Sequence, residues 1–538
     1  MLLGGTLVLA SVSPLWAQDP FDLPKRPSGP YEIRGVVVDG KTGEPLPEVE
    51  LSFQENAQPA GAPFEIIQSD ASGNFRVANL AEGKYTIRAS RQGYAPQAYL
   101  QHENFWTGIA VGPGKDSLHV RFPMSPSATI VGQVTSEIGE AVRGATVTLW
   151  MEQIENGVRS VTQSETANTD DQGRYRLEHL LPGKYSVSVH AMPWYSRYAG
   201  PRTEAGVAYL PDMVYPTLFY PNTRDWHGME WISLRPGQVE AADFHLLPEP
   251  SAHLQIQISE EPEARSNLAL TSELPGGTSN TVEFSSVNVS AGVMEISGIA
   301  AGHYRIQGQR ENLRQDLDVA GTTQMTLDAP VAGGTTIRGS IQVADGDPQP
   351  GFGILQLQDA NGHTYLAQFH RDSGDAAHPA VSFEFENLPA ESQVYEVSIV
   401  QPQDLVVRTI EANDAKVFGT TFAVDGQHEP SLVITVSQVS TAITGIVMKQ
   451  GKPLAGAMVL LMPQNAKDSE RLVRRDQSDS DGTFRLAPLL PGKYLLVALE
   501  HGWELEWSRP EVLQPFLKKA LRLEINEKPI ETVSLEVQ

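Results

Sequence analysis

Asp-Ala-Ser-Gly-Asn-Phe-Arg at residues 70–76, followed by Leu-Ala-Glu-Gly-Lys-Tyr at residues 80–85, decides the fold of this chain, because the same pair of motifs returns twice. The other copies begin at Asp170 and Asp479, and in every copy ten residues separate the two glycines. An internal repeat this regular indicates an array of similar modules. The repeated turn residues are Asp70, Gly73, Gly83, Tyr85, Asp170, Gly173, Gly183, Tyr185, Asp479, Gly482, Gly492 and Tyr494.

A strand of alternating character precedes each copy. The pattern Ile-x-Gly-x-Val stands at residues 33–37, 130–134 and 443–447, and period-two alternation buries one face of a strand. We expect Asp-x-x-Gly to close a tight hairpin, with the aspartate accepting backbone amides. We also expect the second glycine of each copy to sit in a turn at positive φ. Strands and turns then alternate over roughly 60 residues, which is typical of a β-sandwich.

Two weaker copies fill the middle of the chain. Ile-Ala-Ala-Gly-His-Tyr at residues 299–304 keeps the Gly-x-Tyr turn, and residues 337–341 keep the opening strand. The predicted fold is therefore all-β, a tandem array of about five small antiparallel β-sandwich modules of the prealbumin or immunoglobulin-like kind. The expected boundaries are a signal peptide at 1–17, a linker at 18–30, and modules at 31–125, 127–248 with an aromatic and proline-rich insertion at 192–231, 249–331, 335–437 and 440–538.

The first, second and fifth modules resemble the carboxypeptidase regulatory-like domain, a transthyretin-like sandwich often strung in arrays in secreted bacterial proteins. That domain is related in shape to starch-binding-like domains, which bind sugars. The resemblance implies a scaffold or binding module without an active site, because the domain is an appendage to a separate catalytic domain in the enzymes that give it its name. The third module lacks Asp-x-x-Gly at the corresponding position, and the fourth has Ala-Glu-Ser-Gln-Val-Tyr at residues 390–395 in place of Gly-Lys-Tyr.

Charge and composition restrict the partners and the compartment. The 538 residues include 65 acidic and 40 basic side chains, a net charge of −25, and no cysteine, so nucleic acid is not an expected partner and no disulfide can form. Residues 1–17 are uncharged and end in Leu-Trp-Ala, as a secretory signal does, although a positively charged start is missing. No later apolar run approaches the ~20 residues of a membrane-spanning helix. We expect a secreted or periplasmic protein, or one at the cell surface, whose mature chain begins near Gln18.

Candidate catalytic and metal-binding residues are few. His-x-x-Glu pairs at residues 227–230 and 501–504 have zinc-ligand spacing, but a zinc site also needs a third ligand and supporting side chains. Three aspartates within residues 476–481 suggest calcium, yet Ala487 stands where an EF-hand requires a bidentate glutamate. Gly-x-Ser-x-Gly and phosphate-binding glycine loops are absent. We predict no enzyme activity, no cofactor and no metal site.

One segment concentrates aromatic side chains. Nine aromatic residues and five prolines fall within residues 193–231, a composition that favours an ordered extended loop over a helix. Flat rings on an exposed loop suit stacking on sugars or anchoring a protein partner. The alternative is that these rings cover the sandwich of their own module. The candidate ligand-binding residues are Trp194, Tyr195, Tyr220, Trp226 and Trp231.

These observations predict a secreted, non-catalytic multi-module protein that binds glycans or an envelope protein, or acts as an adhesive scaffold there. One alternative is a periplasmic spacer or accessory module of an outer-membrane complex. A zinc-dependent hydrolase is a less favoured alternative. The sequence leaves the ligand, the partner and the oligomeric state open.

Overall fold

The computed structural model places most of the chain. The expected signal peptide and nearly all of the expected linker lie outside the described residues. The structure describes residues 28–56, 63–195, 213–257, 268–277, 279–282, 286–290, 293–308, 314–326, 335–343, 350–359, 364–371, 381–388, 392–402, 405–418, 420–425, 428–438, 441–464, 473–489, 491–526 and 532–538.

Module 1 consists of two facing sheets. The first has the order β4-β1-β8, with β1 antiparallel to β4 and parallel to β8. The second has the order β3-β2-β5, and β6 and β7 both pair with β5. Alternate apolar side chains of both sheets, such as Ile33, Leu51 and Phe53, are fully buried between them. The strands are β1 (Tyr31–Asp39), β2 (Glu50–Glu55), β3 (Glu65–Gln68), β4 (Asn74–Leu80), β5 (Gly83–Ser90), β6 (Gln97–Ala98), β7 (Ile109–Val111) and β8 (Val120–Met124).

Module 2 repeats this topology with a longer hairpin. Its sheets have the orders β12-β9-β17 and β11-β10-β13-β15, and β16 pairs with β13 as β7 pairs with β5. The strands are β9 (Ala128–Thr135), β10 (Thr146–Glu155), β11 (Val158–Asn168), β12 (Arg174–Leu180), β13 (Gly183–His190), β14 (Met213–Val214), β15 (Leu218–Phe219), β16 (Ile232–Leu234), β17 (Val239–Ala241), β18 (Phe244–His245) and β19 (Glu249–Pro250).

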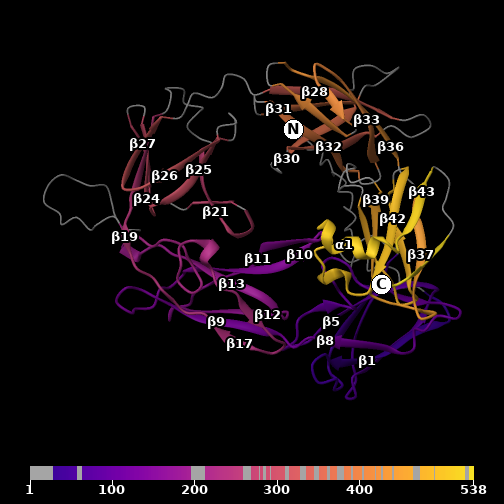
Figure 1. Cartoon of the computed structure of the whole chain (residues 1–538). Helices are drawn as coiled ribbons and strands as arrows, with labels where there is room; N and C mark the ends of the chain where they lie inside the picture. Colours follow the sequence, from indigo (N-terminus) through magenta and orange to yellow (C-terminus); the bar gives the residue numbers. More distant parts are fainter. Residues whose placement is uncertain are drawn as a thin grey trace, which may run out of the picture.

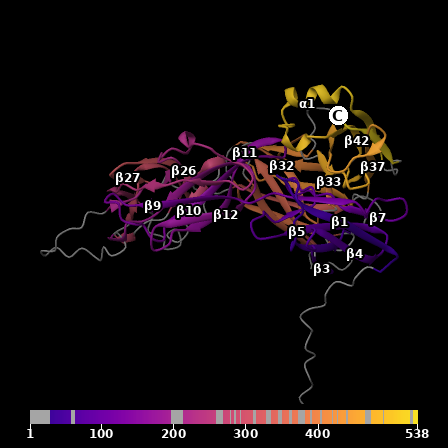
Figure 2. The same cartoon turned by 90° about the horizontal axis from the view of Figure 1, so that it is seen from below.

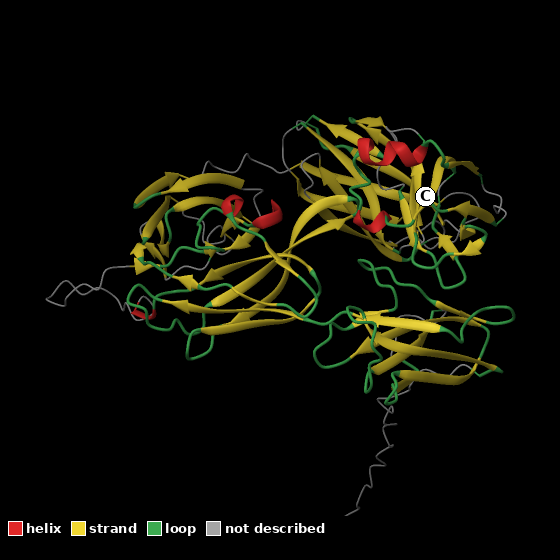
Figure 3. Cartoon of the chain, turned by 60° about the horizontal axis from the view of Figure 1, so that its bottom comes forward, coloured by secondary structure: helices red, strands yellow, loops and turns green. Residues whose placement is uncertain are grey.

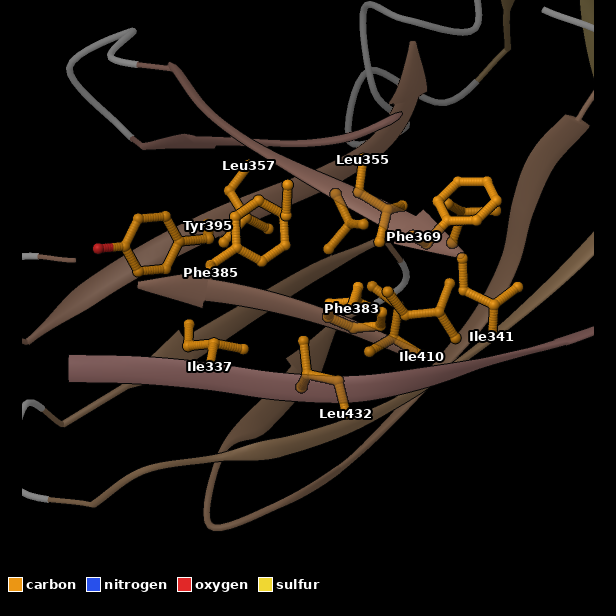
Figure 4. Close-up of a cluster of buried hydrophobic side chains, with 14 of the residues drawn as sticks. Ile337, Ile341, Leu355, Leu357, Phe369, Phe383, Phe385, Tyr395, Ile410 and Leu432 are labelled. Atoms are coloured by element: carbon orange, nitrogen blue, oxygen red, sulfur yellow. The ribbon is translucent and has the colours of Figure 1, made fainter. Parts of the chain in front are cut away.

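Modules 3 and 4 keep the sandwich plan without the full sequence motif. In module 4 all the strands join one nine-stranded sheet, because β30 pairs with both β29 and β31; Figure 4 shows its apolar core. Module 3 comprises β20 (Ala252–Gln257), β21 (Leu268–Glu273), η4 (Pro275–Gly277), β22 (Ser279–Thr281), β23 (Ser286–Ser290), β24 (Val293–Ile299), β25 (Gly302–Gly308), β26 (Arg314–Val319) and β27 (Thr322–Thr326). Module 4 comprises β28 (Thr335–Val343), β29 (Phe352–Asp359), β30 (Thr364–Arg371), β31 (Val381–Leu388), β32 (Gln393–Gln401), β33 (Leu405–Asn413), β34 (Lys416–Phe418), β35 (Thr421–Val424) and β36 (Ser431–Gln438).

Module 5 closes the described chain and carries its single described α-helix, whose eight residues are too few to cross a membrane. Its sheets are β38-β37-β41, with β44 beside β37, and β40-β39-β42-β43. The elements are β37 (Ile443–Lys449), β38 (Lys452–Pro453), β39 (Met458–Pro463), β40 (Arg474–Gln477), β41 (Thr483–Leu486), β42 (Gly492–Leu499), η6 (Gly502–Glu504), α1 (Pro510–Leu517), β43 (Leu521–Ile525) and β44 (Val533–Glu536). The all-β tandem sandwich is confirmed, and each module adds parallel pairing to its opening strand, from one strand in modules 1, 3, 4 and 5 and from both β17 and β18 in module 2.

The glycine of Ile-x-Gly-x-Val and the aromatic residue after Asp-x-x-Gly form one structural unit. Gly132 lies opposite Tyr175 in the sheet register, and a Cβ on Gly132 would stand 2.6 Å from that ring. Phe75 lies in the same way opposite Gly35. A bare glycine is therefore needed where the aromatic side chain folds over the opposite strand. The same pairing recurs as Gly339–Phe383 and Gly445–Phe484.

Two expectations about the turns are wrong. Asp-x-x-Gly does not close a hairpin, because β3 and β4 belong to different sheets and the turn carries the chain from one sheet to the other. The second glycine of each copy does not take positive φ either, since Gly83, Gly183 and Gly492 begin strands outside the left-handed region. Positive φ belongs instead to the first glycine, as at Gly173 with φ of 70°. There a Cβ would lie 2.5 Å from the carbonyl oxygen of Val134.

The tyrosine of each Gly-Lys-Tyr motif explains why the motif begins with glycine. The Tyr185 hydroxyl donates to the carbonyl of Leu181 at 2.9 Å, so its ring folds back over the start of β13. A Cβ on Gly183 would stand 3.2 Å from this ring. Tyr85 makes the equivalent bond to Ala81. The Gly-Lys-Tyr motif thus serves close packing of the tyrosine rather than a left-handed turn.

The five modules follow a curved path that brings the two ends of the described chain together. Figure 1 shows the yellow module 5 beside the indigo module 1 and the end of the β10–β11 hairpin, and the turned views in Figures 2 and 3 keep module 5 next to these parts. Hydrogen bonds between residues more than 300 positions apart in sequence hold this arrangement. We call the contact surface of module 5 with modules 1 and 2 the module junction.

Candidate functional site

The aromatic insertion of module 2 splits into packed and exposed rings. Tyr215 and Phe219 are buried, and Tyr220 packs against the module 2 core. Trp194 is 72% exposed, while Tyr195, Trp226 and Trp231 are partly exposed. Residues 196–212, which include two of the nine aromatic residues, lie outside the described residues. Both sequence-based interpretations thus apply, each to different rings.

The second half of the insertion is an ordered loop at residues 220–231, which we call the module 2 aromatic loop. The Tyr220 amide donates to Val187 of β13 at 2.8 Å, and the Glu230 amide closes the loop on the Tyr220 carbonyl at 2.9 Å. Between them lies the short 3₁₀ helix η2 (Trp226–Gly228), in which the His227 amide donates to the side chain of the capping residue Asp225. The Trp226 ring stacks on His227 with 3.7 Å between ring centroids.

Module 1 has an equivalent loop at residues 99–108, which we call the module 1 loop. The Tyr99 amide donates to Ile87 of β5 at 3.0 Å, and the Thr107 amide donates to the Tyr99 carbonyl at 3.0 Å. These bonds match those of Tyr220 and Glu230 in module 2. Both loops lead into the short strand beside the Gly-Lys-Tyr strand, β7 in module 1 and β16 in module 2. The aromatic loop is therefore a feature of the repeat.

In module 1 the outer edge of β7, together with Gly108 just before it, binds the Asp-x-x-Gly turn of module 5. The Gly108 amide donates to Oδ1 of Asp479 at 2.8 Å, and Lys84 Nζ donates to Oδ2 of the same carboxylate. The Ser480 amide donates to the Gly108 carbonyl at 3.0 Å, and its hydroxyl accepts from Ala110 at 2.8 Å. The turn therefore docks against β7 through backbone and side-chain bonds together.

A second ion pair and an amide side chain extend this contact. Lys115 Nζ lies 2.5 Å from Oδ2 of Asp481, whose side chain is only 10% exposed. Gln477 donates to the Leu100 carbonyl at 2.7 Å and to the Thr107 hydroxyl at 2.9 Å. Gln477 is nearly fully buried, so these bonds satisfy its amide at the centre of the junction.

Aromatic rings of two modules bury each other next to this turn. Trp503 of η6 stacks on His102 with an interplanar angle of 6°, and Phe105 approaches the same indole to 5.0 Å. The Arg475 guanidinium lies 5.3 Å from the Phe105 ring and binds Glu103 through two nitrogens at 2.9 and 3.1 Å. The module 1 loop thus supplies an aromatic and an acidic contact to module 5.

The β10–β11 hairpin of module 2 completes the junction. The Asn156 side chain accepts from Arg475 at 2.6 Å, and the Gly157 carbonyl accepts from the Ser508 hydroxyl at 2.5 Å. Gly157 has φ of 75°, and a Cβ there would lie 2.4 Å from the Trp507 ring. Arg159 bridges to Glu506 at 2.8 Å. The hairpin tip therefore requires glycine both for its turn and for contact with the indole.

The carboxylates of the junction are perturbed by burial and by their lysine partners. Burial raises the pKa of Asp476 to about 6, against the opposing bonds from the backbone amides of Arg485 and Gln477. Burial also raises the pKa of Asp479, although Lys84 opposes the shift. For Asp481 the pKa is lowered, because the bonds from Lys115 and Thr483 outweigh burial. Burial therefore disfavours the ionised form of Asp476 and Asp479, whereas the partners of Asp481 favour its ionised form.

The corresponding turns of modules 1 and 2 are exposed, and the aspartate of each bonds only within its own turn. Asp70 Oδ1 accepts from the amides of Ser72 and Asn74, both at 2.8 Å. Asp170 makes the same pair of bonds within its own turn. In module 5 the equivalent carboxylate binds Gly108 and Lys84 instead. Identical motifs therefore have different roles. The sequence did not predict the module junction, because the residues that Asp479 binds lie in a module far away in the sequence.

The metal candidates have other roles among the described residues. His227 donates or accepts through Nδ1 at 2.8 Å from Asp225, and His501 precedes η6 without a side-chain capping bond. No group of three or more metal-ligating side chains occurs within the described ranges. The three aspartates at residues 476–481, which suggested calcium, bind lysines and backbone amides across and beside the junction. These bonds to lysines and backbone amides explain the three aspartates without calcium.

Comparison with known families assigns the first two modules. Residues 32–125 and 129–207 match the model of the carboxypeptidase regulatory-like domain, and residues 441–514 match the second β-sandwich domain of the BOS complex subunit NOMO1-like proteins. The chain is therefore a β-sandwich repeat protein whose first two modules match the carboxypeptidase regulatory-like domain.

Individual relatives are distant. Colossin-A of Dictyostelium discoideum is 27% identical over 183 residues, which is 30% of this chain but 2% of that protein. GBS52, the minor pilin of Streptococcus agalactiae, is 11% identical, with 41% of this chain and 97% of that chain covered and a TM-score of 0.20. The Bacillus anthracis TIE protein is 9% identical over 94% of this chain and 73% of its own, with a TM-score of 0.17. At TM-scores this low the class rests on the strand topology and the family models.

Proposed function

We propose that this protein is a non-catalytic scaffold of the cell exterior that recognises a glycan or an envelope protein through the module 2 aromatic loop. The observation that carries the proposal is the use of the equivalent module 1 loop, which binds another module through His102, Glu103 and Phe105. A loop position that already serves recognition within the chain is well placed to serve it between molecules. In module 2 the same position offers the partly exposed Trp226.

The junction supports a scaffold because it fixes the loops on a rigid frame. Module 5 bonds to both module 1 and module 2, so three of the five modules hold one another. A folded-back array of this kind is shorter than an extended one, which argues against the alternative of a periplasmic spacer. Rigid support lowers the entropy lost when a loop binds.

Several observations favour a role without catalysis. The partly buried carboxylates of the module junction, Asp476, Asp479 and Asp481, face lysines and backbone amides of the protein itself. The matched regulatory-like domains are appendages in the enzymes that give them their name. A binding or adhesive role therefore accounts for the described residues better than hydrolysis by zinc.

Capture experiments test the proposal. The full-length protein, immobilised, is expected to retain a component of a cell-envelope extract or of a glycan panel, and Trp226→Ala should reduce capture at least tenfold. Phe352→Ala is the matched control, because this aromatic ring is also exposed but belongs to β29 of module 4, outside the insertion. Equal capture by the wild type and Trp226→Ala would contradict the assignment of the site.

A further inference from the structure

A carboxylate occupies a position in module 5 that apolar residues hold in modules 1 and 2. Asp476 of β40 stands three residues before the Asp-x-x-Gly turn, and its Oδ2 accepts from the Arg485 amide of β41 at 2.6 Å. β41 pairs only with β37 among the described strands, so this amide belongs to the outer edge of the sheet. The repeat therefore has a place for a carboxylate oxygen beside this strand.

Module 1 has the same edge without the aspartate. Ile67 of β3 stands at the position of Asp476. The amide that corresponds to that of Arg485 belongs to Arg76 of β4. Arg76 lies opposite Arg34 in the register, and the Arg34 amide donates to the segment that leads into β8, away from β4. Because antiparallel strands alternate between bonded and non-bonded pairs, the Arg76 amide points outward from the sheet. Within the described ranges no acceptor binds it.

A cavity of about 860 Å³, which we call the module 1 cavity, lies at this edge and has the size of a small-ligand site. Its lining includes one apolar residue in place of the aspartate and four basic side chains: Ile67, Arg34, Arg76, His119 and Arg121. Asp70 also lines the cavity, but its carboxylate is bonded to amides of its own turn. His119 is paired with Asp116 at 2.9 Å. The three arginines are therefore what the cavity offers to an anion.

These arginines keep donors for a ligand. Glu32 shares its carboxylate between Arg34 at 2.5 Å and Arg76 at 2.7 Å, and a guanidinium has five N–H donors, so both retain some. Arg121 donates to the Gly43 carbonyl at 3.4 Å, and no described acidic side chain pairs with it. Arg121 is therefore the cation of this cavity that is left for an anion from outside the chain.

Module 2 has an equivalent cavity with a different charge. This cavity of about 500 Å³ is lined by Ala167, Arg176 and Asp243, among others. Asp243 stands where module 1 has Arg121, since each follows the residue whose carbonyl covers the glycine of Ile-x-Gly-x-Val. Arg176 is paired with Glu178. An acidic group replaces the free cation, so the features that suit an anion belong to module 1.

We propose that the module 1 cavity binds an acidic oligosaccharide, with one carboxylate on the outward amide of Arg76, as Asp476 binds Arg485, and a second at Arg121. β4 and β8 flank β1, so the two positions lie about 10 Å apart, which is two strand spacings. A chain of uronic acids carries one carboxylate on each ring and spans that distance. The site lies in another module than the aromatic loop and goes beyond the proposed function.

Two observations favour a glycan over a peptide. A peptide strand added to the edge of β4 would need a row of outward amides, but Asp70 already binds that of Asn74 at 2.8 Å. Leu118, which is 46% exposed, lines the cavity and offers an apolar surface to the C–H face of a sugar ring.

Isothermal titration calorimetry of the full-length protein with trigalacturonate at low ionic strength tests the proposal. Ile67→Asp copies the internal carboxylate of module 5 and should weaken binding about tenfold or more, as should Arg121→Asp. Ile67→Ala is the matched control for the first variant, because it removes the same side chain without adding a carboxylate, and it should bind as the wild type does. Arg522→Asp, on the exposed part of β43 in module 5, is the charge-matched control for the second.

The remaining outcomes overturn the proposal. They are a wild type that does not bind trigalacturonate, binding that neither Ile67→Asp nor Arg121→Asp weakens, and equally tight binding of tri-glutamate, which would make the ligand a peptide. Trp226→Ala should leave this binding unchanged, so the proposed function and this site fail separately. Binding that is lost in Trp226→Ala but kept in Arg121→Asp would place the glycan on the module 2 aromatic loop instead. Circular dichroism of each variant confirms that the fold is retained.

Discussion

Asp479→Ala should open the module junction without unfolding a sandwich. The Asp479 side chain is 15% exposed and accepts from both the Gly108 amide and Lys84. A bond to a charged group contributes about 1.5–3 kcal/mol, and its loss leaves a nearly buried amide without an acceptor. Since Lys84 is 37% exposed and can turn to water, the amide accounts for most of the loss. An increase in junction opening of roughly tenfold to hundredfold follows.

Hydrogen exchange at Gly108 and Ala110 measures this opening directly. Both amides are bonded to module 5, so their exchange should accelerate by the same factor in Asp479→Ala. Asp170→Ala is the matched control, because it removes the same residue from a turn that bonds only to itself. Unchanged exchange at Gly108 in a folded Asp479→Ala protein would refute the claim that this carboxylate holds the modules together.

Three further outcomes are expected. Burial raises the pKa of Asp476 to about 6 in the folded protein, whereas its pKa in the unfolded chain is about 4. The free energy of unfolding should therefore fall by about 3 kcal/mol as the pH rises from about 4 to about 6. Asp476→Asn should remove this part of the pH dependence in chemical denaturation. Gly173→Ala should destabilise module 2 by about 1–3 kcal/mol because of its positive φ, and Gly183→Ala by less, as reported by fluorescence of the buried Trp150 during urea unfolding. Tyr220→Ala should lower the melting temperature because its ring packs on the core, whereas Trp226→Ala should lower binding only; the reverse pattern would contradict the division of the loop.

Local sequence determined the repeat, the class of fold and the position of the aromatic insertion. The alternation of residues 33–37 and the Asp-x-x-Gly and Gly-Lys-Tyr motifs act over neighbouring residues, so their spacing identifies strands and turns before any tertiary contact is known. The concentration of rings at residues 194–231 likewise marked the insertion. Composition could not separate Tyr220, which packs against the module 2 core, from Trp226, which is not part of that core cluster, because both are aromatic residues of one loop.

Only tertiary structure decided the roles of identical motifs. Asp170 and Asp479 stand in the same local sequence, yet one caps its own turn and the other binds Gly108 across the junction. The sheet assignment also corrected the turn, since β3 and β4 pair with different strands although they adjoin in sequence. The physical reason is that a side chain's partner depends on which surface the path of the chain brings against it, and contacts across more than 300 residues leave no periodic signal in the sequence.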